Sequence, residues 1–121
     1  MGRLLSQGPG WRVGYNPSAE VYSALVGDDH WAFELTAAEL ADLRRLANQL
    51  VSSLQAIAPE LMAEETIELE AESDRLWVSI EGTVQTYQLR LILQQARCAE
   101  GSWESHAIPD FLQALSEIAI S

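Results

Sequence analysis

Apolar and polar positions along the chain repeat with two different periods, which separate predicted strands from predicted helices. Alternation with a period of two predicts strands, because successive strand side chains point to opposite faces. Such strands are predicted at residues 4–7, 11–15, 21–26, 30–35, 66–72, 76–81 and 87–93, with a weaker one near Trp103. Turn-forming sequences, among them Gly8-Pro9-Gly10 and Asn16-Pro17-Ser18, separate several of these strands.

A spacing of three and four residues predicts a long helix after Thr36. The four residues from Thr36 form a capping box, in which Thr36 and Glu39 each satisfy a backbone N–H of the other. The apolar stripe that follows consists of Leu40, Leu43, Ala47, Leu50, Leu54, Ile57 and Leu61. Pro59 is expected to end or kink this helix near Ala58. A second helix is expected to open at Pro109. Its predicted core face consists of Ile108, Phe111, Leu112, Leu115 and Ile118.

The succession of elements predicts an α+β fold, with one or more curved antiparallel sheets and two packed helices. Sliding the chain by 72 residues gives nine identities over 47 pairs, including Trp31 with Trp103. We interpret residues about 3–49 and 75–121 as two copies of a strands-then-helix unit, related by pseudo-twofold symmetry. Chance similarity between two strand-rich halves is the alternative. Copies this short bury too little surface alone, so residues 1–121 are expected to form a single domain.

Charge narrows the range of functions. The 121 residues include 18 acidic and seven basic side chains, all seven of them arginine, for a formal net charge of −11. Residues 1–58 carry four arginines against six acids, whereas residues 59–121 carry three against twelve. This charge argues against binding bare nucleic acid or an anionic membrane surface, since both attract cationic side chains. The 48% apolar content excludes intrinsic disorder.

The single cysteine, Cys98, excludes a disulfide within the chain and favours a reducing compartment. The first ten residues hold no apolar run of signal-peptide length. Nor does any window approach the ~20 uninterrupted apolar residues of a membrane-spanning helix. We therefore expect a cytoplasmic protein without membrane spans. The sequence leaves open whether it is a monomer or a homodimer.

One dense polar cluster falls in a predicted tight loop. Asp28, Asp29 and His30 offer two carboxylates and an imidazole, which are ligands for a divalent metal. Gly-Asp-Asp is also an ordinary turn sequence, in which Asp bonds its own backbone, and we favour this interpretation. The chain shows no nucleophile elbow, phosphate-binding glycine loop or zinc signature. The sequence therefore assigns no catalytic residue, metal or cofactor.

An acidic run and an excess of tryptophan are the other candidate features. The run comprises Glu64, Glu65, Glu68, Glu70, Glu72 and Asp74. It is either a solvated strand face that keeps an edge soluble or a docking surface for a basic partner. The four tryptophans are Trp11, Trp31, Trp77 and Trp103, and all lie in or beside predicted strands. Core positions are the default for them, and a partner-binding platform is the alternative.

Two segments of the N-terminal half resemble the sequences of a known protein family. The sequences Gly10-Trp11-Arg12-Val13-Gly14 and Leu25-Val26-Gly27-Asp28-Asp29-His30-Trp31-Ala32-Phe33-Glu34-Leu35-Thr36 resemble a small cyanobacterial and plastid family of unknown function. The resemblance implies a curved antiparallel sheet with packed helices. It also implies kinship in fold with single-stranded-DNA-binding transcriptional coactivators and whirly proteins, in which two strands-then-helix units form the module. It implies no activity.

Three functions of different classes remain. The first is a non-catalytic module that binds an unidentified protein partner through its acidic surface. The second is a single-stranded nucleic-acid binder of the whirly type, which the charge disfavours. The third is a small-ligand binder or enzyme with a cavity between sheet and helix.

Overall fold

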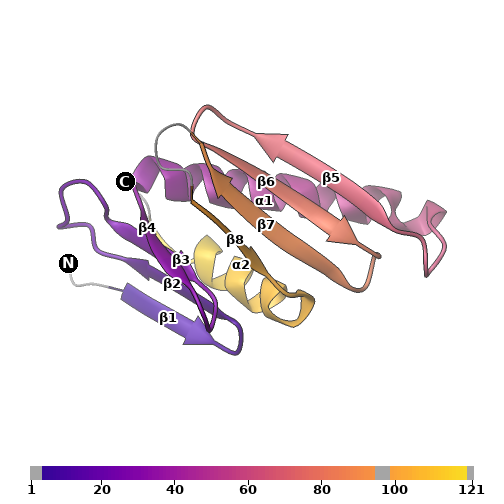
Figure 1. Cartoon of the computed structure of the whole chain (residues 1–121), viewed down its shortest axis with the longest axis horizontal. Helices are drawn as coiled ribbons and strands as arrows, with labels where there is room; N and C mark the ends of the chain where they lie inside the picture. Colours follow the sequence, from indigo (N-terminus) through magenta and orange to yellow (C-terminus); the bar gives the residue numbers. More distant parts are fainter. Residues whose placement is uncertain (1–3, 95–98, 120–121) are drawn as a thin grey trace.

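Four strands followed by a helix occur twice along the chain (Figure 1). The structure, a computed structural model, describes residues 4–94 and 99–119. The first unit consists of β1 (Leu4–Gly8), β2 (Trp11–Tyr15), β3 (Ala24–Gly27), β4 (Ala32–Leu35) and α1 (Ala37–Ile57). After η1 (Ala58–Glu60), the second consists of β5 (Ile67–Glu72), β6 (Leu76–Gly82), β7 (Tyr87–Leu93), β8 (Glu100–Trp103), η3 (Ser105–Ala107) and α2 (Ile108–Ser116). Within the described residues, the expected α+β class with antiparallel sheets and two helices is confirmed.

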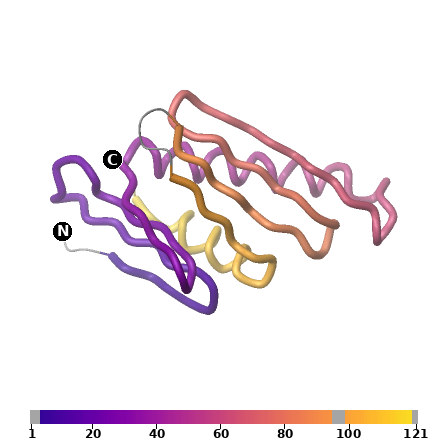
Figure 2. The backbone as a smooth tube through the Cα atoms, viewed as in Figure 1, coloured from indigo at the N-terminus to yellow at the C-terminus, as the bar shows by residue number. Residues whose placement is uncertain are grey.

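Each unit forms its own four-stranded sheet. The strands lie in chain order in both, β1-β2-β3-β4 and β5-β6-β7-β8, and neighbouring strands are antiparallel. Figure 2 shows these sheets as two successive up-and-down meanders. Gly10 has a φ of 84° in the β1–β2 turn, and a Cβ there would lie 2.8 Å from Nε2 of His106 on η3. Glycine therefore lets this turn pack closely against the second unit.

Helix α1 begins at the predicted capping box. The Thr36 hydroxyl accepts a hydrogen bond from the Glu39 N–H at 3.1 Å, and the Glu39 carboxylate accepts one from the Thr36 N–H at 2.9 Å. The buried apolar side chains of the helix are Leu40, Leu43, Leu46, Ala47, Leu50 and Leu54. The α-helix ends at Ile57 and tightens into η1, because Pro59 lacks the N–H that a further helical turn requires. Leu61, which was expected to extend the stripe, therefore lies beyond the helix.

Strand β3 begins later than the alternation predicts. The predicted strand covered residues 21–26, but pairing starts only at Ala24. The Asn16 N–H donates to the Ser23 carbonyl at 2.6 Å, which closes the loop between β2 and β3. This hydrogen bond holds the residues between them in the loop, outside the sheet ladder.

The two units exchange their helices. Helix α1 packs chiefly against β5 and β6, whereas α2 packs against β1 and β2, and the two helices also contact each other. Figure 1 shows α1 running behind the strands of the second sheet. The largest fully buried side chains are Trp103, Phe111, Leu35, Leu40, Leu43, Leu46, Leu76, Ile80, Leu89, Leu91, Leu93 and Ile108. Because each sheet is covered mainly by the helix of the other unit, neither unit encloses a core alone.

The offset of 72 residues aligns only part of this repeated succession. It brings the start of α1 close to that of α2, and it matches Trp31 with Trp103. However, it sets β1 against β6, although the order of elements pairs β1 with β5. Repeats drawn at 3–49 and 75–121 therefore leave β5 out of the second unit. No single offset serves the whole unit, because connections and strands differ in length between the two copies.

Aromatic rings join the two units at the end of β8. Trp103 stacks on Phe111, with ring centroids 4.3 Å apart, and meets Trp31 edge-on at 5.1 Å. Trp31 in turn stacks on Phe33 at 5.0 Å. The buried Trp103 indole N–H donates to the Gly27 carbonyl at 2.8 Å, so the second unit satisfies a backbone group of the first. This aromatic cluster links β3, β4, β8 and α2.

Replacing Gly101 with alanine is expected to destabilise the protein. The Trp31 ring rests on this glycine, and a Cβ there would lie 2.4 Å from two ring atoms. Since stacking holds the ring in place, we expect Gly101→Ala to lower the free energy of unfolding by about 1–3 kcal/mol. Urea denaturation followed by tryptophan fluorescence measures the loss.

Gly14→Ala is the matched control for this substitution. A Cβ at Gly14 would meet its nearest atoms at 3.5 Å, which is ordinary van der Waals contact. Equal losses in the free energy of unfolding of the two variants would contradict the expectation that the close contact between Gly101 and the Trp31 ring causes the effect.

Candidate functional site

The acidic run lies along an edge of the second sheet. Strand β5 pairs with β6 on one side only in the described sheet. Its three glutamates are exposed, and they alternate with apolar residues that are half-buried over the core. The exposed set is Glu68, Glu70 and Glu72, and the half-buried set is Ile67, Leu69 and Ala71. The predicted strand with one acidic, solvated face is therefore confirmed.

The other members of the predicted run flank this strand. Glu64 and Glu65 are exposed in the segment before β5, where the Glu65 carboxylate accepts a hydrogen bond from the Met62 N–H at 3.3 Å. Asp74 is exposed in the turn between β5 and β6. The run thus follows one edge of the molecule from η1 to the β5–β6 turn.

Strand register extends the acidic surface across the open side of the sheet. Glu68 is paired with Glu81 on β6, and Glu100 on β8 belongs to the same row as Glu72. Paired residues point to the same face of a sheet. Glu81 and Glu100 are exposed like the β5 glutamates. We call Glu68, Glu70, Glu72, Glu81 and Glu100 the acidic face.

Two apolar side chains lie within the acidic face. Trp77 and Ile92 are paired with each other on β6 and β7, between Glu72 and Glu100, and both are half-buried. Among the other tryptophans, Trp11 and Trp103 are buried in the core, as the default interpretation expected. Trp77 is therefore the tryptophan placed to touch a molecule lying on this face.

Arg90 is the only basic residue that the described strands place on this side of the sheet. Its Nε atom donates to the Glu100 carboxylate at 3.1 Å, and Nη2 bonds the same oxygen. This hydrogen bond, together with the charge of Glu100, raises the pKa of Arg90. Arg90 thus compensates the negative charge of Glu100 on β8. Three other glutamates, Glu68, Glu70 and Glu72, lie on β5 at the opposite edge of the sheet.

Asp42 on α1 anchors the turn that ends the acidic run. The Ser73 hydroxyl donates to its Oδ2 atom at 2.7 Å, and Arg75 Nη1 donates to the same oxygen at 3.2 Å. Arg45 lies 3.5 Å from the other oxygen. Burial alone would raise the pKa of Asp42, but these hydrogen bonds and the arginine charges outweigh burial and lower it. The buried carboxylate therefore ties the β5–β6 turn to the helix beneath it.

The cluster of Asp28, Asp29 and His30 forms a turn. Asp28 Oδ1 accepts hydrogen bonds from the N–H groups of His30 at 2.6 Å and Trp31 at 2.9 Å. Asp29 instead bonds the Gly10 N–H at 3.1 Å. The two aspartate side chains therefore bind backbone N–H groups, and no metal-binding group of three or more His, Cys, Asp or Glu occurs among the described residues.

This turn also sets the start of β4. The strand predicted at residues 30–35 begins only at Ala32, because the Asp28 N–H donates to the Trp31 carbonyl at 3.0 Å. Arg12 from β2 fastens the same turn, donating to the carbonyls of Asp28 at 2.9 Å and Trp31 at 3.1 Å.

Residues 6–118 match the model described as a domain of unknown function, DUF1818. The chain belongs to the DUF1818 family. A search of the curated proteins finds no match. The expected membership of a family of unknown function is thus confirmed for most of the chain.

A solved structure shares the fold of this DUF1818 domain. It is the crystal structure of a protein with unknown function from Prochlorococcus sp. NATL2A, described as a DUF155 family member. The TM-score is 0.89 at 31% sequence identity, over 95% of this chain and 97% of that chain. Separately, the described helices include none long and apolar enough to cross a membrane. Cys98 lies outside the described residues.

Sequence reasoning does not find three residues of this site. Glu81 and Glu100 stand apart from the dense run, and only the strand register brings them onto the same face. The β5–β6 hairpin pattern offered a signal for Glu81, which occupies an outward position of its strand. Asp42 has no local signal, because its partners Ser73 and Arg75 come from a distant hairpin.

Replacing Asp42 with asparagine is expected to destabilise the DUF1818 domain at neutral pH. The substitution removes a charge that two hydrogen bonds and two arginines stabilise, so we expect a loss of about 1–3 kcal/mol in the free energy of unfolding. The folded pKa lies below the ordinary value of 3.8, so the carboxylate stabilises the fold above that value. That contribution disappears as the pH falls further, and the gap between wild type and variant closes. Urea titrations from pH 7 to pH 3 measure this gap.

The exposed Glu60 on η1 provides the control. Glu60→Gln removes the same charge but is expected to change stability by under about 0.5 kcal/mol. A gap for Asp42→Asn that persists unchanged at pH 3 would contradict the electrostatic origin of the effect.

Proposed function

We propose that this chain is a protein-interaction module whose acidic face binds a positively charged segment of a partner. The observation that carries the proposal is the concentration of five exposed glutamates on one open side of a sheet, with Arg90 as its counter-charge. A predominantly acidic surface of this kind attracts positively charged partners and repels negatively charged ones. Long-range attraction acts over about 8 Å at physiological ionic strength.

The geometry of β5 favours an extended partner segment. In an edge strand, one row of backbone N–H and C=O groups has no neighbouring strand. An incoming strand adds backbone hydrogen bonds at such an edge, and side chains alternate between its two faces. Basic residues at every second position would then lie beside Glu68, Glu70 and Glu72. Trp77 offers an aromatic contact deeper in the same face.

Single-stranded nucleic acid is the weaker candidate. It draws support from the resemblance in sequence to the family that we related in fold to whirly proteins. A phosphate backbone laid on the acidic face would be repelled by its carboxylates, and Arg90 is already engaged by Glu100. We therefore include nucleic acid as an arm of the test.

Neutralising the acidic edge is expected to weaken binding of a basic peptide. The probe is a fluorescein-labelled octapeptide of alternating lysine and valine, and fluorescence anisotropy measures its affinity. In a triple variant with Glu68→Gln, Glu70→Gln and Glu72→Gln, three charge pairs are lost. At about 0.2–1 kcal/mol each, this predicts roughly a tenfold weaker complex at low salt. Wild-type binding should weaken as salt is added.

A second triple variant carries the same charge change at other exposed sites. It combines Glu20→Gln, Glu60→Gln and Glu117→Gln, and it should retain wild-type affinity for the peptide. An equal loss in both triple variants would show general charge attraction and overturn the proposed surface. Saturable binding of oligothymidine that weakens steeply with salt would instead favour the nucleic-acid function.

A further inference from the structure

Strand β1 lies at an edge of the first sheet, and its charge differs from that of the other edge strands. The two described sheets end in four edge strands, β1, β4, β5 and β8. The other three each carry at least one glutamate, whereas β1 has the sequence Leu-Leu-Ser-Gln-Gly, without a charged side chain. Proteins commonly protect exposed strand edges with charges, prolines or bulges. The five residues of β1 include none of these protections, and they pair with β2 in an unbroken register.

The backbone of β1 presents polar groups to this edge at alternate residues. The Leu4 carbonyl faces β2, because its oxygen lies 3.5 Å from the position that a Cβ on Gly14 would occupy. Successive carbonyls of a strand point to opposite sides, so those of Leu5 and Gln7 point away from β2. In an antiparallel ladder, the N–H of a residue points the same way as its carbonyl. Leu5 and Gln7 therefore offer donors and acceptors that no described strand uses.

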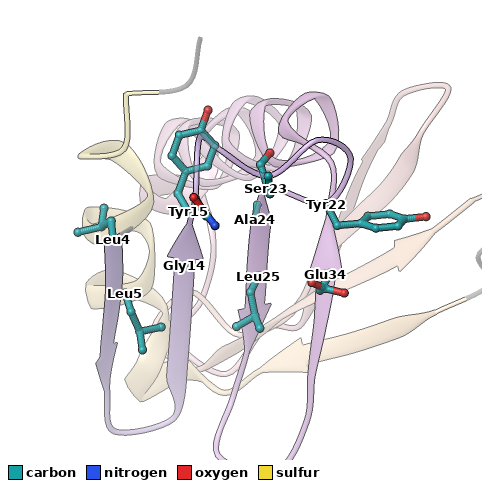
Figure 3. A pocket seen from close by; sticks show the side chains of 11 residues that line it. Leu4, Leu5, Gly14, Tyr15, Tyr22, Ser23, Ala24, Leu25 and Glu34 are labelled. Atoms are coloured by element: carbon teal, nitrogen blue, oxygen red, sulfur yellow. The ribbon is translucent and has the colours of Figure 1, made fainter. Parts of the chain in front are cut away.

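The outer surface beside this edge is apolar and hollow. Gly14 on β2 is paired with Leu5 on β1 and with Leu25 on β3. Figure 3 shows the two leucine side chains on either side of this glycine, which leaves a trough within a hollow of about 350 Å³. Leu5 thus has a glycine on one side and no described strand on the other, and it is 65% exposed. A strand added at the edge would supply its missing neighbour.

The distribution of charge favours a second copy of this chain as the occupant of the edge. Residues 1–58 carry four arginines against six acids, a net charge of −2, and residues 59–121 carry three against twelve, a net charge of −9. Figure 1 shows β1 and the acidic strand β5 at opposite borders of the molecule. Two copies that meet at β1 therefore keep their acidic faces apart, whereas contact through the second unit would bring like charges together.

Twofold symmetry makes this edge complementary to itself. When two β1 strands run antiparallel about an axis at Ser6, Leu5 of each copy lies opposite Gln7 of the other. These are the residues whose backbone groups point outward, so each Leu5–Gln7 pair exchanges hydrogen bonds in both directions. Because β1 is the one uncharged edge among the described strands, the assembly closes at two copies.

We propose that β1 pairs with β1 of a second copy, so that the two first sheets join into one antiparallel sheet. The contact lies outside the acidic face, and it does not depend on the partner proposed for that face. Five residues from each copy bury less than the roughly 800 Å² per partner of a standard stable interface. The dimer is therefore expected to dissociate on dilution.

Sedimentation equilibrium at micromolar to millimolar concentrations of the chain measures this association. We expect the average mass to rise from the 13.4 kDa of one chain toward twice that value. Added salt should strengthen the dimer, because it screens the repulsion between two chains of net charge −11. Binding of the basic peptide to the acidic face has the opposite salt dependence, so the two proposals succeed or fail separately. A single-chain mass up to millimolar concentration would overturn the dimer.

Two substitutions at Gln7 separate the role of the backbone from that of the side chain. Gln7→Pro removes the outward N–H but no hydrogen bond to β2, and is expected to weaken the dimer at least about tenfold. Gln7→Val keeps the N–H and favours a strand, so this variant should remain dimeric. Equal dissociation constants for the two variants would contradict pairing through this edge.

A cysteine crosslink tests the register, and it decides the proposal even where Gln7→Pro fails to fold. At the twofold axis the two Ser6 residues form a non-hydrogen-bonded pair with Cα atoms about 4.5 Å apart, which suits a disulfide. In a Cys98→Ser background, Ser6→Cys should therefore yield crosslinked dimers on mild oxidation.

Gln7→Cys in the same background is the matched control for the crosslink. The two copies of residue 7 lie diagonally across the strand pair, about 7–8 Å apart, which exceeds the span of a disulfide. Gln7→Cys should therefore crosslink far more slowly than Ser6→Cys. The proposal fails if the two variants crosslink at equal rates, or if Ser6→Cys gives no dimer.

Discussion

The exchange of helices between the two units is the constraint on which the rest of the structure depends. Each sheet has one apolar face, and the helix that covers it comes mainly from the other unit. The Trp103 N–H bond to the Gly27 carbonyl and the rings around it hold the two halves in this relation. Because both described helices pack on the inner faces of the sheets, neither of them covers an outer face.

These two outer faces have opposite chemical character although the units share a plan. The second presents five glutamates, and the first presents a glycine trough between leucines. Residues 59–121 carry twelve of the 18 acidic side chains, so most of the formal charge of −11 belongs to the second half of the chain. Among the described residues that line the hollow on the first sheet, Glu34 is the one acidic side chain. The outer faces of the two sheets thus differ in chemical character, although both sheets have the same strand order.

The sequence pattern alone predicted those elements that neighbouring residues in the chain determine. The capping box at Thr36 located the start of α1, and alternation along β5 separated its solvated glutamates from its half-buried residues. Features fixed by distant contacts were not accessible in this way. The loop bond from Asn16 delays β3, and the environment of Asp42 depends on a hairpin more than 30 residues away. The trough at Gly14 likewise exists only once three strands are in register.

The exchange of helices also governs the order in which the chain can acquire its structure during synthesis. The inner face of the first sheet, with Val13 and Val26 fully buried, is covered by α2, which follows all the described strands in the chain. Until residues 108–116 have left the ribosome, that sheet lacks the helix that covers most of its inner face. Its contacts also span long stretches of chain, which slows folding relative to a helical bundle of equal size. The nascent first unit therefore exposes an apolar sheet face to chaperones and to misassembly with another copy of itself.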